Sequence, residues 1–119
     1  MIVVYGLKTC DTCRKALKWL MEQGIAHRFH DLRADGLPEA DLRRWMTATG
    51  PDVLVNRRGT TWRGLPPEEQ AADLTAERAV TLALGQPALL KRPVFDLGQT
   101  VVVGFKAEQQ AAVRQAAAS

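Results

Sequence analysis

The N-terminal part of the chain combines two short apolar runs with one helical pattern. Residues 2–5 are β-branched or aromatic and end at Gly6, which predicts a short buried strand. From Asp11 onward, apolar residues recur at three- and four-residue steps, as on one face of a helix, and Gly24 is placed to end it. Residues 27–31 then predict a second strand, parallel to the first, which closes a right-handed β-α-β unit.

The middle of the chain, residues 38–86, predicts helices rather than strands. Two of these helices open on a proline, at Pro38 and at Pro66, because proline is tolerated in the first turn of a helix. Another is expected from about 75 to 85, where the first residue is a threonine whose hydroxyl suits an N-cap. Residues 56–64 are polar and contain glycine, which indicates a loop.

The C-terminal part predicts a hairpin and a final helix. Two apolar runs, 94–97 and 100–103, are separated by Gly98-Gln99, a short connection typical of a β-hairpin. Residues 107–118 are rich in alanine and glutamine and favour a helix, with Val113 as its large apolar anchor.

Taken in order, these elements predict an α/β protein with a four-stranded mixed sheet flanked by helices. A helical insertion over about 38–86 separates the second and third strands. With 119 residues and 46% hydrophobic residues, the chain has the size and composition of one globular domain, 1–119.

Charge and cysteine content narrow the class of protein further. Sixteen basic and thirteen acidic residues give a net charge of +3, a mild excess that favours small anionic partners and does not indicate direct binding of nucleic acid. The first residues lack the pattern of a signal peptide, and no run approaches the span of a bilayer, so no membrane association is expected. Two closely spaced cysteines are too few for a disulfide framework, so we expect a cytoplasmic protein.

Cys10 and Cys13 form a C-x-x-C motif between the first strand and the first helix, which is an arrangement suited to redox chemistry. The amides and the positive dipole end of a helix N-terminus stabilise a thiolate, so the pKa of Cys10 should be lowered. Lys8 and Arg14 add positive charge nearby, and Asp11 opposes them. Cys13 lies one turn further on, where it can attack a mixed disulfide on Cys10, so these residues are the candidate nucleophile and resolving thiol.

The cysteines and the nearby histidines also have interpretations that involve no redox chemistry. Both cysteines could be small buried hydrophobic residues. A zinc site with His27 and His30 is not expected, because residues three apart in a strand point to opposite faces. His30 alone is more typical of a packing or surface residue than of a partner for the thiol.

Four blocks of sequence, in order, resemble the arsenate reductase (ArsC)/Spx family, and its YffB-like subgroup in particular. The blocks are YGLKTCDTCRKA at 5–16, FHDLRADG at 29–36, NRRGTTWR at 56–63 and LKRP at 90–93. The resemblance covers nearly the whole chain and implies a thioredoxin-like fold with a helical insertion.

The resemblance also implies roles for individual residues. In the reductases, a cysteine of the first helix attacks the oxyanion and arginines hold it, and the matching positions are Cys10, Arg58 and Arg92. Guanidinium groups bind oxyanions through paired hydrogen bonds and lower the pKa of a nearby thiol, which fits these roles. Pro93 matches the cis-proline of the family, which places backbone groups beside the active thiol.

Two departures from the family bear on the activity. The arsenate reductases carry a further arginine late in the sheet, where this chain has VVGF at 102–105, and the resemblance therefore favours the subgroup's glutathione-dependent thiol reduction. The YffB-like subgroup often has a single cysteine in this motif, whereas Cys13 gives this chain the cysteine pair of the Spx regulators.

Three functions follow as hypotheses. The first is a thiol oxidoreductase that acts on a small thiol or disulfide, has no tightly bound cofactor or metal, and takes glutathione as co-substrate. The alternatives are an Spx-like redox-sensing transcription regulator that binds the α subunit of RNA polymerase, and an arsenate reductase.

Overall fold

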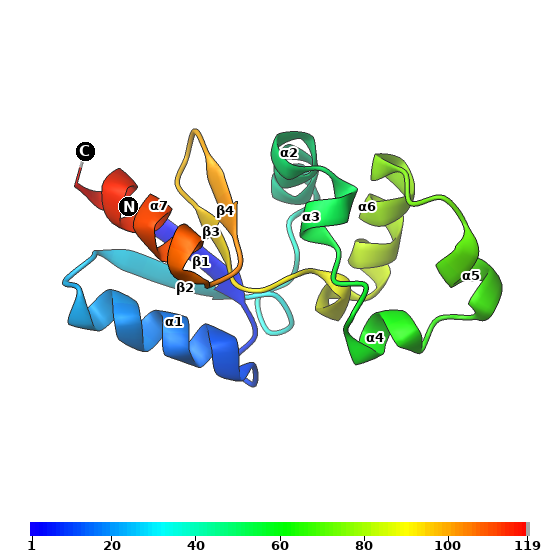
Figure 1. Ribbon diagram of the computed structural model, residues 1–119, viewed down its shortest axis with the longest axis horizontal. Coiled ribbons are helices and arrows are strands. Elements are labelled where there is room, and N and C mark those ends of the chain that lie inside the picture. Colours follow the sequence, from blue (N-terminus) through cyan, green and yellow to red (C-terminus); the bar gives the residue numbers. More distant parts are fainter. Residues whose placement is uncertain (119) are drawn as a thin grey trace. The chain divides into compact units, whose positions relative to one another are not determined.

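The protein is described by a computed structural model that covers residues 1–118, and its elements are labelled in Figure 1. The strands are β1 (Ile2–Gly6), β2 (His27–Asp31), β3 (Val94–Asp96) and β4 (Val101–Val103). The helices are α1 (Asp11–Glu22), α2 (Glu39–Thr49), α3 (Pro51–Leu54), α4 (Thr60–Arg63), α5 (Pro67–Ala71), α6 (Ala76–Gly85), the 3-10 helix η1 (Pro87–Leu89) and α7 (Ala107–Ala117).

Contacts between residues divide the chain into two compact units. The first, the sheet unit, comprises Met1–Gly36 and the segment that begins at Arg92. The second, the helical unit, is Leu37–Lys91, and it contains the insertion expected over about 38–86.

The sheet has the strand order β2-β1-β3-β4. β1 is parallel to β2 and antiparallel to β3, and β3 is antiparallel to β4, so the prediction of a four-stranded mixed sheet is confirmed. Gly6, the last residue of β1, lies opposite Asp31, and the preceding Tyr5 lies opposite Val94. The end of β1 is therefore flanked by the end of β2 and the start of β3, which come from distant parts of the sequence.

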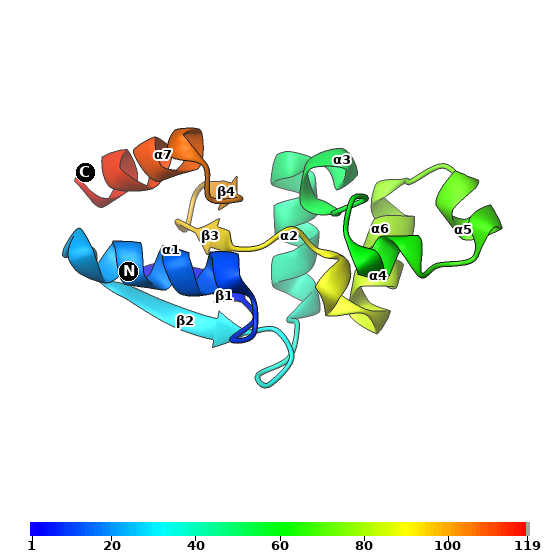
Figure 2. The same ribbon diagram turned by 60° about the horizontal axis from the view of Figure 1, so that its bottom comes forward.

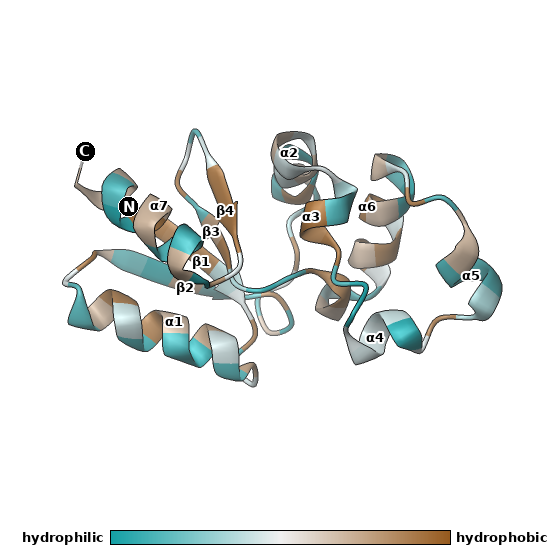
Figure 3. Ribbon diagram, in the orientation of Figure 1, coloured by the Kyte–Doolittle hydropathy of each residue, from teal (hydrophilic) through white to brown (hydrophobic). Residues whose placement is uncertain are grey.

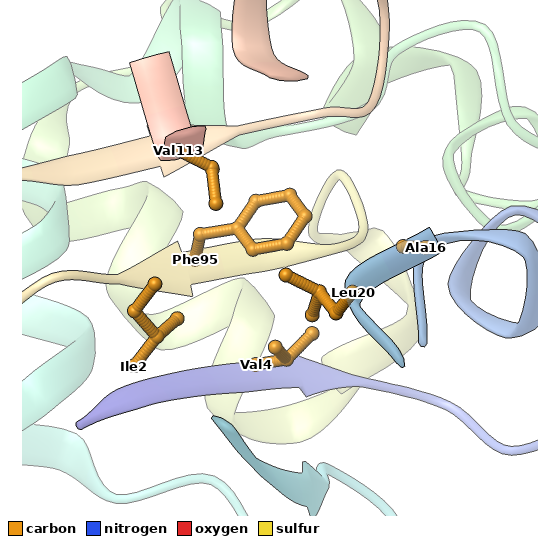
Figure 4. Close-up of a cluster of buried hydrophobic side chains, with 6 residues drawn as sticks. All are labelled: Ile2, Val4, Ala16, Leu20, Phe95 and Val113. Atoms are coloured by element: carbon orange, nitrogen blue, oxygen red, sulfur yellow. The ribbon is translucent and has the colours of Figure 1, made fainter. Parts of the chain in front are cut away.

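Helices α1 and α7 share one face of this sheet, and Figures 1 and 2 show them running beside its strands. Val4 and Phe95 are direct partners in the ladder and therefore point to the same face. They belong to one buried cluster with residues of both helices: Ile2, Val4, Ala16, Leu20, Phe95 and Val113 (Figure 4). The α1 ribbon alternates between hydrophilic and hydrophobic positions in Figure 3, as expected of a helix with one buried face.

The hairpin of β3 and β4 turns where the sequence predicts it. The backbone N–H of Leu97 donates to the carbonyl of Thr100 at 2.9 Å, and Gly98 has a φ of 93°. The carboxylate of Asp96 accepts the N–H of Gly98 at 3.0 Å, which ties the turn to β3. A residue with a Cβ would be strained at Gly98, because L-residues rarely adopt this positive φ.

The helical unit contains short helices that the sequence does not predict, among them α3 and η1. The expected loop over 56–64 contains the short helix α4, and Trp62 within it is only 5% exposed. Burial of this indole explains the turn, since it draws a polar segment onto the hydrophobic interior. The N-cap of α6 is confirmed, with the Thr75 side chain accepting the N–H of Arg78. As far as residue 118, no helix has the length and apolar character needed to cross a bilayer.

Adjacent positions in α1 test the assignment of its buried face. Leu20 is fully buried and its neighbour Met21 is 74% exposed. Leu20→Ala should lower the free energy of unfolding by about 2–5 kcal/mol because it leaves a cavity. Met21→Ala should change it by less than about 0.5 kcal/mol, measured by urea denaturation. Equal effects of the two substitutions would contradict this assignment.

Candidate active site

Cys10 lies at the N-terminus of α1, directly after a tight turn that follows β1. Its backbone N–H donates to the carbonyl of Leu7 at 3.0 Å, which closes the turn. It occupies the N-cap position of α1 with extended φ and ψ of −86° and 121°, and its carbonyl accepts the N–H of Arg14 at 3.0 Å. This backbone geometry places the thiol, which is partly exposed, beside the unpaired amides of the first helical turn.

The pKa of the Cys10 thiol lies below its ordinary value because favourable contacts outweigh the cost of burial. Burial alone would raise the pKa, since it disfavours the charged form. Hydrogen bonding from the backbone N–H of Cys13 and from the Arg92 side chain lowers it. The Cys13 thiol and the positive charge of Arg92 act in the same direction, so the direction of the shift is the one expected from the sequence.

Cys13 is fully buried one turn into the helix, against the end of β1. A Cβ added at Gly6 would come within 2.5 Å of the Cys13 sulfur, so the glycine provides the space that this thiol occupies. Burial raises the pKa of Cys13 to about 12, and the neighbouring Cys10 sulfur adds to the rise. The pair therefore ionises in a defined order, with Cys10 as the thiolate and Cys13 as the protonated thiol.

Arg92 and Pro93 reach the same place from the start of β3. The Arg92–Pro93 peptide bond is cis, as the resemblance implies, and Pro93 is fully buried. The carbonyl of Pro93 accepts the N–H of Gly104 at 2.9 Å, which joins it to the end of β4. Arg92 is partly exposed, and its guanidinium interacts with the Cys10 thiolate.

The nearby charges of α1 largely offset each other. Arg14 forms an ion pair with Asp11 at 3.1 Å and also donates to the carbonyl of Thr9 at 3.2 Å. Both side chains of the ion pair are mostly exposed, so its contribution to stability is small. These contacts hold the Arg14 side chain at the start of α1.

A buried carboxylate that the sequence analysis did not single out lies beneath this turn. Asp31, 4% exposed, accepts the backbone N–H of Lys8 at 2.9 Å and those of Arg33 and Ala34 at 2.8 Å each. The Ala34 hydrogen bond, with the other two and the charge of Lys8, outweighs burial and lowers the pKa of Asp31. An aspartate at the C-terminal end of a predicted β-strand is the sequence signal that could have indicated this role.

Arg58 belongs to the helical unit. Its side chain is exposed, and its backbone N–H donates to the side chain of Asn56 at 3.1 Å in the loop before α4. The neighbouring Arg57 pairs with Asp52 at 2.9 Å, and its guanidinium lies 5.6 Å from the centre of the Trp62 ring. That Arg58 binds an anion held at Cys10 stays a prediction.

Other candidate features of the structure do not involve Cys10 or Cys13 in their hydrogen bonds or lining residues. A hollow of about 840 Å³ is lined by the start of β1, the connection between α1 and β2, the residue after β3 and part of α7, among them Ile2, Ile25, Leu97 and Arg114. His30 contacts the carbonyl of Gly36 through Nε2 at 2.7 Å. Residues 1–118 contain no group of three or more histidine, cysteine or acidic side chains placed to hold a metal ion.

Comparison with known proteins defines the family. A sequence model of the ArsC family matches residues 5–113, and the chain belongs to that family. A protein of Haemophilus influenzae is 45% identical over 113 residues, which cover 94% of this chain and 98% of that protein. A solved structure of a protein named YffB has a TM-score of 0.87 and 45% identity, and the match covers 94% of this chain and 97% of that one. The fold is thus thioredoxin-like, and the chain falls in the YffB-like subgroup.

More distant relatives include proteins of different function. The global transcriptional regulator Spx 1 of Lactococcus lactis is 26% identical over 92% of this chain and 85% of its own length. An arsenate reductase from Vibrio cholerae has a TM-score of 0.75 at 16% identity over 95% of both chains, a likeness that concerns the fold alone.

The contribution of Arg92 to the thiolate can be tested by the pH dependence of Cys10 alkylation. Arg92→Gln removes a hydrogen bond and a positive charge, so the pKa of Cys10 should rise. The alkylation rate by iodoacetamide at pH 7 should then fall by about threefold or more. Arg114→Gln, which removes a positive charge near the start of β1 instead, serves as the control and should leave the profile in place. A Cys10 profile that is the same in all three proteins would contradict this role of Arg92.

The raised pKa of Cys13 predicts a loss of stability in alkaline solution. Because the folded protein holds this proton up to a pH of about 12 and the unfolded chain releases it near 9.0, the stabilisation is complete below 9.0. It declines as the pH rises through this window. The difference in free energy of unfolding between the unmodified protein and Cys13→Ala should shrink from pH 9 toward pH 12. A constant difference would show that Cys13 ionises as in the unfolded chain.

Proposed function

We propose that the protein is a thiol–disulfide oxidoreductase that uses Cys10 as its nucleophile and glutathione as its co-substrate, in a reducing compartment such as the cytoplasm. The observation that carries the proposal is the Cys10 thiol at the N-terminus of α1, with its pKa lowered by the Cys13 amide and by Arg92. A thiolate present at neutral pH attacks disulfides, whereas a protonated thiol does not.

The first step is an exchange of one sulfur–sulfur bond for another. The Cys10 thiolate attacks one sulfur of the substrate disulfide, a mixed disulfide forms on Cys10, and the other sulfur leaves as a thiolate that takes a proton from solvent. The Arg92 guanidinium, which stabilises the Cys10 thiolate in the resting protein, becomes available to the anionic groups of the substrate as that charge is consumed.

The second step resolves the mixed disulfide in one of two ways. Cys13 can lose its proton, attack Cys10 and release the bound thiol, after which two glutathione molecules reduce the Cys10–Cys13 disulfide and become glutathione disulfide. Alternatively, a glutathione thiolate attacks the substrate sulfur of the mixed disulfide, which releases Cys10 as the thiolate and leaves glutathione in a disulfide with the substrate thiol. The full burial and raised pKa of Cys13 favour direct attack by glutathione, since Cys13 must ionise before it can act.

Recognition of an anionic substrate is assigned to Arg58, Arg92 and Pro93. Glutathione carries carboxylates that guanidinium groups bind through paired hydrogen bonds. Pro93 precedes β3, whose first residue, Val94, pairs with Tyr5 near the end of β1, and its backbone is assigned to contact with an extended substrate. Family membership over residues 5–113 supports the transfer of these roles to this chain.

Replacement of Cys10 tests the proposal directly. Cys10→Ser should abolish glutathione-coupled reduction of a small disulfide and the formation of a mixed disulfide, because a serine hydroxyl is not ionised at neutral pH. Retained turnover in Cys10→Ser would overturn the assignment of the nucleophile.

The matched control is Cys13→Ser, which separates the two routes of resolution. Activity retained in Cys13→Ser indicates direct attack by glutathione, and loss of activity with an accumulated mixed disulfide indicates resolution by Cys13. Mass spectrometry after exposure to oxidised glutathione adds a second readout. One glutathione on Cys10 supports the glutathione cycle, and an internal disulfide supports the dithiol route.

A second candidate function is redox-sensing transcriptional regulation. It is favoured by the likeness to Spx 1, at 26% identity over 92% of this chain, together with the C-x-x-C pair that the Spx regulators carry. Capture of the α subunit of RNA polymerase by the purified protein, without glutathione-coupled turnover, would favour this function over the first.

Arsenate reduction can be distinguished from thiol–disulfide exchange by the substrate that is consumed. Residues 102–105, at the end of β4 and just after it, are Val-Val-Gly-Phe, so the late arginine of the arsenate reductases has no counterpart there. Thiol consumption that depends on arsenate would favour this activity, and consumption with disulfides alone favours the proposed oxidoreductase.

A further inference from the structure

Asp31 contacts the turn that carries Cys10, although it lies on a different strand. Its Oδ2 accepts the N–H of Lys8 at 2.9 Å, and the N–H of Leu32 donates to the carbonyl of Gly6 at 2.8 Å. Asp31, the last residue of β2, and Leu32, the residue that follows it, therefore hold the chain on both sides of Leu7. Since Cys10 donates to the carbonyl of Leu7, the position of the nucleophile is linked to this attachment.

The same carboxylate also organises the turn that follows β2. Its Oδ1 accepts the N–H groups of Arg33 and Ala34, and the carboxylate of Asp35 accepts the N–H of Asp31 itself. A role confined to this turn would require only Oδ1. The second oxygen, directed at Lys8, joins the turn to the cysteine loop from 23 residues away in the sequence.

We propose that Asp31 is a positioning residue for Cys10, whose buried carboxylate holds the Lys8 amide and thereby places the nucleophile at the N-terminus of α1. The inference rests on the proposed function, because it assigns Asp31 to the site at which Cys10 reacts. Asp31 touches neither the thiol nor the substrate and acts through the backbone of residues 7–10.

The geometry explains why a carboxylate serves here. Three backbone N–H groups converge on Asp31, and a carboxylate accepts all of them with two oxygens and no donor of its own. An asparagine offers one oxygen and one NH₂ group, so it can satisfy either Lys8 or the 33–34 turn, and the NH₂ faces the remaining N–H. The loss of the Lys8 contact frees the turn before Cys10 and weakens the alignment of the thiolate with the Cys13 amide.

The test compares two buried carboxylates of the sheet unit. Asp31→Ala and Asp31→Asn are measured beside Asp96→Ala, which removes a carboxylate that is 6% exposed and holds the hairpin turn instead. Cys10 reactivity is followed as the pH profile of iodoacetamide alkylation, with circular dichroism to confirm that each protein is folded.

Asp31→Ala should raise the pKa of Cys10 and lower its alkylation rate at pH 7 by about threefold or more. Asp31→Asn should have the same or a smaller effect, and Asp96→Ala should leave the profile unchanged. An unchanged profile in both Asp31 variants, or an equal change in Asp96→Ala, would overturn the proposal, since a merely structural loss does not depend on which carboxylate is removed.

A measurement on the unmodified protein covers the case in which the Asp31 variants do not fold. The Lys8 amide proton, followed by nuclear magnetic resonance from pH 6 to pH 2, should shift as the Asp31 carboxyl is protonated. The absence of such a shift would remove the contact on which the proposal depends.

The pKa of Cys10 in the unmodified protein distinguishes this proposal from the proposed function. An ordinary pKa of Cys10 there defeats the proposed function. A low pKa that is unchanged in the Asp31 variants defeats only the role of Asp31.

Discussion

The chemistry of this protein depends on the balance between burial and hydrogen bonding at one sulfur atom. Burial disfavours the Cys10 thiolate, and the Cys13 amide and Arg92 more than offset that cost. The same environment has the opposite result at Cys13, which is fully buried and lies next to the negative charge of Cys10. One short segment therefore holds two chemically identical side chains in different protonation states, and the proposed function assigns the role of nucleophile to the one that ionises more readily.

The sheet topology brings the groups that support this sulfur to one place. Because β1 lies between β2 and β3, the turn that leaves β1 is flanked by the end of a parallel strand and the start of an antiparallel one. The parallel strand supplies Asp31, and the antiparallel strand is preceded by Arg92 and the cis-proline Pro93. Helices α1 and α7 pack on one face of the sheet, where Leu20 of α1 and Phe95 of β3 share a buried cluster. This packing fixes α1, whose N-terminus carries the two cysteines.

Membership of the ArsC family is compatible with more than one activity, since reductases and transcription regulators share this fold. The distinction rests on the site. A lowered pKa at Cys10 suits both a catalytic nucleophile and a redox sensor, whereas the fate of the mixed disulfide differs between them. Resolution by glutathione regenerates the thiolate and permits turnover. A lasting Cys10–Cys13 disulfide would instead store the oxidation state, as a regulator requires.

The strands, the longer helices and the position of Cys10 could be predicted from the sequence, because each depends on a local pattern. The apolar period of α1, the β-branched run of β1 and the glycine of the hairpin each act within a few residues, and the position of Cys10 before a helix already indicates a stabilised thiolate. The role of Arg92 was inferred only from the family resemblance, since nothing near residue 92 in the sequence points to residue 10.

The helix α4 and the contact of Asp31 with Lys8 were not predicted at all. Both arise from long-range packing, in which Trp62 is buried within its unit and a carboxylate at the end of β2 finds an amide 23 residues earlier. The sequence by itself determined which residues could carry the chemistry, and the tertiary structure decided which of them meet, because strand pairing joins segments that no local pattern connects.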